Sequence, residues 1–238
     1  MLLAPGLRDR NTMCGRFTYY TPPETLLLNY FPDGLEVDGQ FPPRYNITPG
    51  VGIPMIRARL SGPAVMAPSL WGFRPTWAGD KAPAPINARA ETAARSRYFS
   101  EAFAHHRCVI PANGWYEWTR EGPVKQPWYI TSSDDSKDAT LFFAGLWTPY
   151  EGDETTACAI ITEPAAEHLR HIHDRQPVVL DSACLADWLN PDITDRQQIR
   201  AVSHRLPTRQ LTAWPVSPAV NNPRNDSAEL IRKQSRQE

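Results

Sequence analysis

A methionine directly precedes a cysteine in the segment Met13-Cys14-Gly15-Arg16-Phe17. A chain that began at Cys14 would carry a thiol and an α-amine on adjacent carbons. Their ordinary pKa values are about 8.5 and about 8, so both groups are partly nucleophilic at neutral pH. Such a pair attacks an aldehyde twice: the amine forms an imine, and the thiol then closes a five-membered thiazolidine ring, an intramolecular step of a kind that reaches effective molarities of about 10⁵ M or more. Taken alone, however, Cys14 is better explained as an ordinary cysteine near a chain end.

Three further segments gather polar and titratable side chains. Imine formation expels water, so the chemistry needs groups that donate and accept protons. A carboxylate between Trp115 and Trp118 would be desolvated, which raises its pKa toward neutrality. The three segments are 86–92 (INARAET) with Asn87, 114–118 (GWYEW) with Glu117, and 171–175 (HIHDR) with His173.

Each of these residues also has a plainer interpretation. Asn87 could cap a helix or stabilise a turn. Glu117 could face solvent from a strand, which is the stronger interpretation on the residues alone. Three histidines, His168, His171 and His173, could suggest a metal site because helical spacing can place them on one face. No HExxH pattern and no evident fourth ligand accompanies them, so we interpret His168 and His171 as helix-surface residues.

The elements that must position these residues are mostly short strands. Proline is abundant, with 24 residues, which favours stiff loops and short elements. Strands are predicted at 53–59, 64–73, 107–111, 114–119, 126–131, 141–147, 157–162 and 177–180, and helices at 24–31, 90–104, 163–171, 182–189 and 194–203. Many strands with a few helices between them predict an α+β fold, a single domain with a curled, barrel-like, mainly antiparallel β-sheet and peripheral helices.

Composition adds weak constraints. The formal net charge is −1, so the chain lacks the basic excess that nonspecific DNA-binding proteins usually show. Most basic residues are arginine, which grips phosphate bidentately, although a codon bias explains this at least as well. No apolar run approaches the roughly 20 residues that span a membrane. Four cysteines without a CxxC pair fit a reducing compartment, so we expect a cytoplasmic, nucleoid-associated protein that is not secreted.

The order of several sequence blocks makes the combination recognisable. The chain resembles the SRAP (SOS-response-associated peptidase) family of abasic-site processing proteins, and the resemblance covers nearly everything from Met13 to Ile231. Any one block would be a weak signal, whereas eight blocks in order are specific. The blocks are MCGRF (13–17), RYNITPG (44–50), LWGFRPTW (70–77), INARAET (86–92), SRYF (96–99), GWYEW (114–118), IHDRQPVVL (172–180) and WPVSPAV (214–220).

The resemblance implies roles for individual residues. Cys14 corresponds to the nucleophile that forms a thiazolidine with ring-opened deoxyribose, and Asn87 to the residue that holds the sugar and positions the cysteine. Glu117 corresponds to the acid–base group, and His173 to a second catalytic group that acts in sugar-ring opening and in crosslink reversal. The implied partner is single-stranded DNA containing abasic sites, with no membrane, metal or other cofactor, and a monomer is the default. Residues expected at the DNA are Arg16, Asn46, Pro49, Trp77, Arg89, Arg97, Trp118 and Thr162.

The start of the chain decides whether this chemistry is available. An internal Cys14 has no α-amine, so either Met13 is the true start, which we favour, or residues 1–13 are removed by self-cleavage. Residues 1–12 are then a disordered leader or a misassigned start, residues 13–231 the SRAP domain and residues 232–238 a frayed tail. Two other functions stay open. One is a cysteine or N-terminal-nucleophile peptidase acting on protein, with His173 as base, and the other is a noncovalent module for single-stranded DNA.

Overall fold

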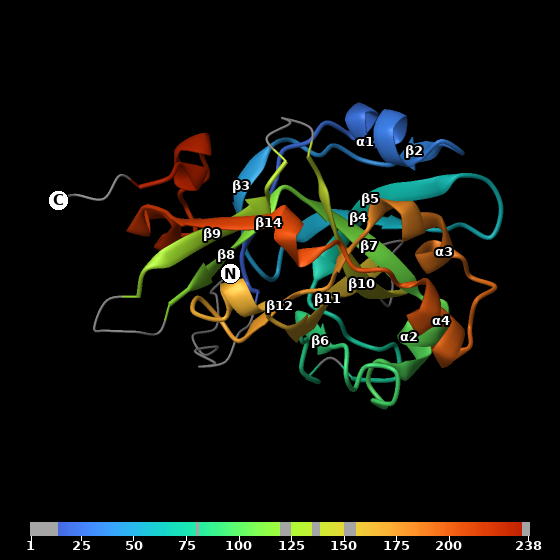
Figure 1. Cartoon of the computed structure of the whole chain (residues 1–238). Helices are drawn as coiled ribbons and strands as arrows, with labels where there is room; N and C mark the ends of the chain where they lie inside the picture. Colours follow the sequence, from blue (N-terminus) through green and yellow to red (C-terminus); the bar gives the residue numbers. More distant parts are fainter. Residues whose placement is uncertain (1–13, 80, 120–124, 135–138, 150–155, 235–238) are drawn as a thin grey trace.

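The computed structural model describes residues 14–79, 81–119, 125–134, 139–149 and 156–234 (Figure 1). The expected leader, residues 1–12, and most of the expected frayed tail therefore lie outside the described residues. None of the described helices is long and apolar enough to cross a membrane.

Five strands close into a small barrel at the centre of the molecule (Figure 1). They are β4 (Gly52–Arg57), β5 (Ala64–Trp71), β7 (Arg107–Ala112), β10 (Leu141–Pro149) and β11 (Thr156–Pro164). Neighbours pair antiparallel from β5 through β4, β7 and β10 to β11, and a parallel pairing of β11 with β5 completes the ring. Closure leaves no free edge in the barrel. The predicted α+β, barrel-like fold is thus confirmed.

A second, five-stranded antiparallel sheet lies beside the barrel and carries the start of the described chain. Its strand order is β14 (Leu211–Pro215), β9 (Pro127–Ser132), β8 (Gly114–Trp118), β1 (Phe17–Tyr19) and β3 (Arg44–Ile47). Because β8 follows β7 after a single residue, Asn113, the two sheets are joined at this corner.

The remaining elements are short and lie around the two sheets. Of the strands, β6 and β12 both pair with β11, β13 pairs with β10, and β2 pairs with β5. The strands are β2 (Leu35–Val37), β6 (Asn87–Arg89), β12 (Arg175–Pro177) and β13 (Val179–Leu180). The α-helices are α1 (Pro23–Tyr30), α2 (Ser100–His105), α3 (Leu185–Leu189) and α4 (Arg196–Val202). The 3₁₀ helices are η1 (Glu167–Leu169), η2 (Ser182–Cys184), η3 (Thr208–Gln210), η4 (Pro218–Asn221) and η5 (Ala228–Ile231).

Two predicted helices are wrong over much of their length. The helix predicted at 90–104 is a series of turns until α2 begins at Ser100. The amide of Ala90 donates instead to the carbonyl of Thr162 at 2.8 Å, which continues the β6–β11 pairing. The segment predicted as a helix at 163–171 first extends β11 to Pro164, because Glu163 pairs with Gln176 across β12, and then makes only η1. In both places tertiary pairing overrides a weak local helix preference.

The core links the barrel to the strand that follows Cys14. Phe17 and Trp71 are both fully buried, and their ring centroids lie 5.2 Å apart in an edge-to-face arrangement. The indole of Trp71 also donates to the carbonyl of Ile86 at 3.0 Å, directly before β6. Trp71 therefore packs in the core between β1 and the start of β6. Trp147 is only partly buried, with the Arg57 guanidinium 4.9 Å from its ring centroid.

Candidate functional site

The structure brings Cys14 and Glu117 into direct contact although they are 103 positions apart. The backbone nitrogen of Cys14 donates a hydrogen bond to Oε1 of Glu117 at 2.9 Å. Strand β1 makes this contact, because Phe17 pairs with Trp115 and Thr18 with Gly114 on β8, so the residues before β1 run alongside the end of β8. The Glu117 side chain is only 3% exposed, which decides against the solvent-facing interpretation.

The surroundings of Cys14 disfavour the thiolate form of its side chain. Cys14 is fully buried, and burial, followed by the nearby charge of Glu117, raises the pKa of its thiol well above the ordinary value. Among the described residues Cys14 alone combines a side chain larger than hydrogen with a positive φ, of 41°. This left-handed conformation costs a non-glycine residue about 1–2 kcal/mol. Such strain persists only where the surroundings impose it, and it gathers at functional sites.

His173 has a partner for each of its protonation states. Its Nδ1 accepts a hydrogen bond from the amide of Arg175 at 3.0 Å, which requires a neutral ring whose proton is on Nε2. Nδ1 also lies 3.1 Å from Oδ1 of Asp174, a contact that is favourable only when Nδ1 carries a proton. Asp174 is exposed, so its carboxylate is free to turn toward solvent when the imidazole is neutral. The arrangement suits a group that gains and loses protons.

Contacts through two strands, β8 and β9, connect the segment that contains His173 to the Cys14 side of the molecule. Glu117 on β8 pairs with Trp128 on β9. The Trp128 ring meets the edge of His171, two residues before His173, with centroids 5.4 Å apart and ring planes at 87°. His171 is exposed as predicted, but it lies on the loop after η1 rather than on a long helix.

Asn87 and Arg89 lie on strand β6, which corrects the expectation of a loop-to-helix junction there. Asn87 pairs with Ile160, and Arg89 with Thr162, on β11. The strand therefore fixes both residues beside the chain that continues into η1 and His173. Asn87 is partly exposed and Arg89 is exposed. Because Asn87 lies within β6 and the next helix begins only at Ser100, the helix-capping role considered for Asn87 does not apply.

Arg175 is a central residue that sequence reasoning passed over. Its guanidinium binds both oxygens of Glu91, with Nη2 2.9 Å from Oε2, and Nη2 also donates to the carbonyl of Thr162 at 2.7 Å. The hydrogen bonds from Arg175 hold the pKa of the Glu91 carboxyl below its ordinary value. Arg175 thereby connects the His173 segment to the segment that follows β6. Its position within the IHDRQPVVL block (172–180) is the sequence feature that could have identified Arg175 as part of the site.

A second group of polar contacts surrounds Arg16. Its Nη1 donates to Oδ1 of Asn46 and to the carbonyl of Val220, both at 2.7 Å. The guanidinium carbon lies 5.8 Å from the ring centroid of Trp118, whose indole nitrogen donates to Oδ1 of Asn221 at 2.7 Å. Burial lowers the pKa of the Arg16 guanidinium, because the charge is partly removed from water. A phosphate would be a favourable partner for such a cation.

The residues predicted to meet DNA fall into three groups by exposure, and Arg16 and Trp118, described above, are half-buried. Pro49, Trp77, Arg89 and Arg97 are exposed, and the Arg97 guanidinium lies 4.9 Å from the ring centroid of Trp77. Asn46 and Thr162 are fully buried, so their side chains offer nothing to a ligand in this structure.

The buried pair is occupied inside the protein. The Asn46 amide nitrogen donates to the carbonyls of Val220, Asn222 and Asn225, and the Thr162 hydroxyl accepts from Arg175 at 3.3 Å. In this structure, therefore, each of these two side chains contacts a neighbouring arginine, Arg16 for Asn46 and Arg175 for Thr162, rather than the protein surface. Among the described residues no group of three or more metal-ligating side chains is placed to hold a metal.

The closed barrel, the joined sheet and the buried contact between Cys14 and Glu117 describe a small α+β protein with a candidate site at the start of β1. The SOS response associated peptidase (SRAP) profile matches residues 13–223, and the chain belongs to this family. It is 38% identical over 227 residues to abasic site processing protein YedK of Escherichia coli, covering 92% of this chain and 99% of that protein. It is 36% identical over 226 residues to abasic site processing protein YoqW of Bacillus subtilis, with the same coverage.

Solved structures agree on the fold. A crystal structure of a Bacteroides thetaiotaomicron protein superposes with a TM-score of 0.78, covering 93% of this chain and all (100%) of that one at 21% identity. A phage-related protein of Bordetella bronchiseptica, 30% identical, gives a TM-score of 0.70 and covers 85% of this chain and 94% of its own.

Proposed function

We propose that the chain, in a form that begins at Cys14, recognises abasic sites in single-stranded DNA and bonds to them covalently. The observation that carries the proposal is the hydrogen bond from the Cys14 nitrogen to Glu117 at 2.9 Å. Once residues 1–13 are absent, that nitrogen is an α-amine, and the buried carboxylate already lies within proton-transfer distance of it. The names of the relatives, which are abasic site processing proteins in two bacterial species, support the same substrate.

The reaction balances without a cofactor. The amine adds to the aldehyde carbon of ring-opened deoxyribose, and the carbinolamine loses water to give an imine. The Cys14 sulfur then adds to the imine carbon while the thiol proton passes to nitrogen, which closes the thiazolidine. We assign Glu117 to accept a proton from the α-ammonium and to return one to the departing hydroxyl. The high thiol pKa is compatible with this order, because the amine attacks first and the thiol only after it.

The other residues take supporting roles in this proposal. His173, with a hydrogen-bond partner in each protonation state, opens the sugar ring and assists reversal of the crosslink, and Asn87 on β6 holds the sugar. Exposed Arg89, Arg97, Trp77 and Pro49, with Arg16 and Trp118, contact phosphates and flanking groups. Asn46 and Thr162 instead position Arg16 and Arg175.

Selectivity then depends on the aldehyde rather than on base edges. An abasic site lacks a base to read, so we expect little sequence specificity. A few arginine–phosphate contacts supply the electrostatic part of binding, which agrees with a net charge of only −1. An aromatic side chain such as Trp118 stacked on a flanking base adds roughly 1–3 kcal/mol.

A denaturing gel tests the proposal against its rivals. Protein that begins at Cys14 is mixed with single-stranded DNA carrying one abasic site, and a covalent band is expected. DNA with a tetrahydrofuran analogue, which has no aldehyde, should give no band. Cys14→Ser keeps the α-amine and loses sulfur, so it should give a band only after borohydride reduction of the imine. A band with the analogue, or an unchanged stable band with Cys14→Ser, would contradict the mechanism.

Self-removal of residues 1–13 is a second proposed activity. The amide nitrogen that would leave in cleavage before Cys14 is the one bound to Glu117, and Cys14 has a strained φ of 41°. Hydrolysis of this bond consumes one water and releases the leader with a new carboxylate. Chain expressed from Met1 and purified should lose residues 1–13, as judged by intact mass, while Glu117→Gln should keep them. Retention of the leader by the unmutated chain during prolonged incubation would overturn this second proposal.

A further inference from the structure

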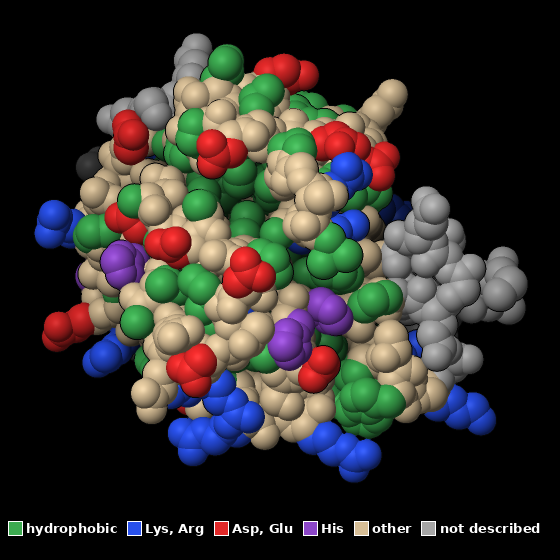
Figure 2. Space-filling model, turned by 90° about the vertical axis from the view of Figure 1, so that its right-hand side faces the viewer, with side chains coloured by type: hydrophobic (Ala, Val, Ile, Leu, Met, Phe, Trp, Pro, Cys, Tyr) green, Lys and Arg blue, Asp and Glu red, His purple; other side chains and the backbone are tan. Residues whose placement is uncertain are grey.

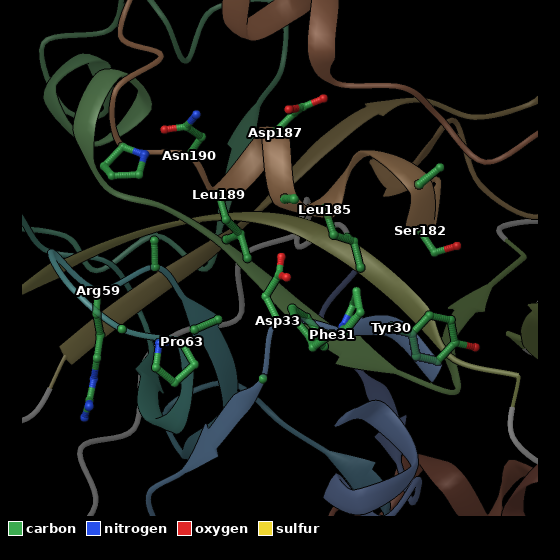
Figure 3. Close-up of a pocket in the computed structure, with 18 residues that line it drawn as sticks. Tyr30, Phe31, Asp33, Arg59, Pro63, Ser182, Leu185, Asp187, Leu189 and Asn190 are labelled. Atoms are coloured by element: carbon green, nitrogen blue, oxygen red, sulfur yellow. The ribbon is translucent and has the colours of Figure 1, made fainter. Parts of the chain in front are cut away.

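A pocket of about 620 Å³ lies apart from the residues around Cys14. It is lined by the end of α1 and the following turn, by the β4–β5 turn, and by η2 and α3. Phe31, Leu185 and Leu189 form its buried apolar walls, and Figure 3 shows Leu185 and Leu189 entering it from α3. We call this surface the α1–α3 pocket. Its volume lies in the range of about 300–1,000 Å³ typical of ligand sites.

Exposed hydrophobic side chains lie near the α1–α3 pocket, although none of them lines it: they are on α1, on the β4–β5 turn and on β2, which pairs with β5. Five large hydrophobic residues of the described chain are exposed, and four of them lie on α1, β2 and the β4–β5 turn; the fifth is Trp77. Leu28 is 81% exposed and Leu60 fully exposed (103%), and the other two are Leu27 and Val37. Leu28 and Leu60 lie within two residues of the lining residues Tyr30 and Arg59, so they add exposed apolar surface next to the pocket, as protein-interaction sites do.

The charge at the α1–α3 pocket is negative. Asp33 and Asp187 line it, both are exposed, and neither forms an ion pair within the described part of the chain. Arg59 also lines it, but Glu36 binds its guanidinium through two hydrogen bonds, and in Figure 3 the Arg59 side chain extends away from the middle of the pocket. Figure 2 views the molecule from this side and shows a hollow with hydrophobic side chains inside it and acidic side chains around it.

We propose that the α1–α3 pocket binds a basic amphipathic helix of a partner protein. Aliphatic side chains at i, i+3 or i+4, and i+7 of such a helix would enter the apolar trough. Lysine or arginine side chains flanking that face would meet Asp33 and Asp187. A second copy of this chain fits poorly, because it would bring the same two carboxylates into each other's neighbourhood. Nucleic acid fits poorly for the same reason, since its phosphates would face an acidic rim.

The proposal is independent of the crosslinking chemistry, and its test uses the whole chain. The probe is a fluorescent synthetic peptide of roughly 15 residues, with leucine on one helical face and lysine on both flanks. We expect saturable binding by fluorescence anisotropy, and amide chemical-shift changes at residues such as Leu185 and Leu189. The double variant Asp33→Lys/Asp187→Lys should weaken binding at least about tenfold. The same peptide with glutamate in place of lysine should bind at least about tenfold more weakly.

A matched variant separates a local contact from general charge attraction. Glu167→Lys/Glu229→Lys changes the net charge equally at exposed positions elsewhere, and it should bind the peptide within about twofold of the unmutated chain. Equal weakening by both double variants, absence of binding at millimolar peptide, or shift changes centred on Cys14 would overturn the proposal. So would a dimer of the unmutated chain in sedimentation that Asp33→Lys/Asp187→Lys dissolves, because the occupant would then be a second copy.

Discussion

The surroundings of Cys14 and the α1–α3 pocket are built on different principles. Around Cys14, polar groups make hydrogen bonds inside the protein: Glu117 accepts from the Cys14 amide, and Arg16 donates to Asn46 and to the carbonyl of Val220. In the α1–α3 pocket, the walls are apolar, and the carboxylates of Asp33 and Asp187 form no ion pair with the described part of the chain. The first region holds its geometry in advance, as chemistry requires. The second leaves its interactions unmade, as recognition of another molecule requires.

If this contrast is correct, loss of one carboxylate near Cys14 should greatly slow crosslinking, whereas loss of one carboxylate in the α1–α3 pocket should leave the crosslinking rate unchanged. Glu117→Gln should slow crosslinking by about 10²- to 10⁴-fold, the usual contribution of general acid–base catalysis. Asp187→Asn, an equally conservative change, should leave the crosslinking rate unaltered. Single-turnover band formation on a denaturing gel measures both rates. Equal rates for Glu117→Gln and the unmutated chain would remove the distinction.

Arg175 should show how strongly the Cys14 region depends on preorganisation. Arg175→Met keeps much of the aliphatic volume but loses the bonds to Glu91 and Thr162, so we expect about a tenfold slower crosslinking rate from the loosened His173 segment. The Arg175 side chain anchors the backbone whose amide donates to His173 Nδ1, so a loosened backbone at residue 175 should also shift the pH dependence of the rate. Glu91→Gln retains one hydrogen bond and should have a smaller effect. A changed DNA affinity with unchanged rate and pH profile would show that Arg175 acts on binding alone.

Asn221 offers a finer test of positioning. It accepts the indole hydrogen bond of Trp118, so Asn221→Ala should release the ring and weaken binding of the tetrahydrofuran-containing DNA by about 1 kcal/mol, roughly fivefold. The crosslinking rate at saturating DNA should stay the same. Anisotropy titration measures the affinity, with Asn225→Ala as a neighbouring asparagine control whose side chain binds Ala219 instead. Equal losses in both variants would point to general loosening of this segment.

The smallest expected effect is a decrease in the free energy of unfolding at alkaline pH, to which the buried cysteine thiols contribute. Burial raises the pKa of Cys158 to about 12, above the value of about 8.5 in an unfolded chain. The unfolded state therefore releases the thiol proton first, and the free energy of unfolding falls as pH rises above about 8.5, by up to about 1.4 kcal/mol per pH unit for one thiol. Denaturant titrations between about pH 7 and pH 9.5 measure this slope, which should be shallower for Cys158→Ala. An identical slope would assign the loss to other groups.

Short apolar runs made the barrel predictable, since all five of its strands, together with β8 and β9 of the joined sheet, overlap strands predicted from the sequence. The helices predicted at 90–104 and 163–171 failed where pairing with β11 and β12 captured the chain, an effect that no local window contains. Strands such as β1 and β6, each three residues long, are too short to carry a periodic signal.

The residue types of the candidate site could be predicted from the sequence, but which of these residues are buried and which are exposed could not. Resemblance to the SRAP family placed Cys14 with Glu117, which spacing alone could not do across 103 positions. Burial separated Asn46 and Thr162 from the exposed arginines, and burial depends on the assembled fold. The contribution of Val220 is a backbone carbonyl, which any residue type would supply, so the sequence held no mark of it.

The most direct test is the mass of the crosslinked peptide. After reaction with abasic DNA, digestion by nuclease and protease, and tandem mass spectrometry, the adduct should sit on a peptide whose first residue is Cys14. Its mass should equal the peptide plus the deoxyribose remnant minus one water, with both the nitrogen and the sulfur of Cys14 blocked. An adduct on a lysine or on another cysteine, or on a peptide that still carries residues before Cys14, would contradict the account.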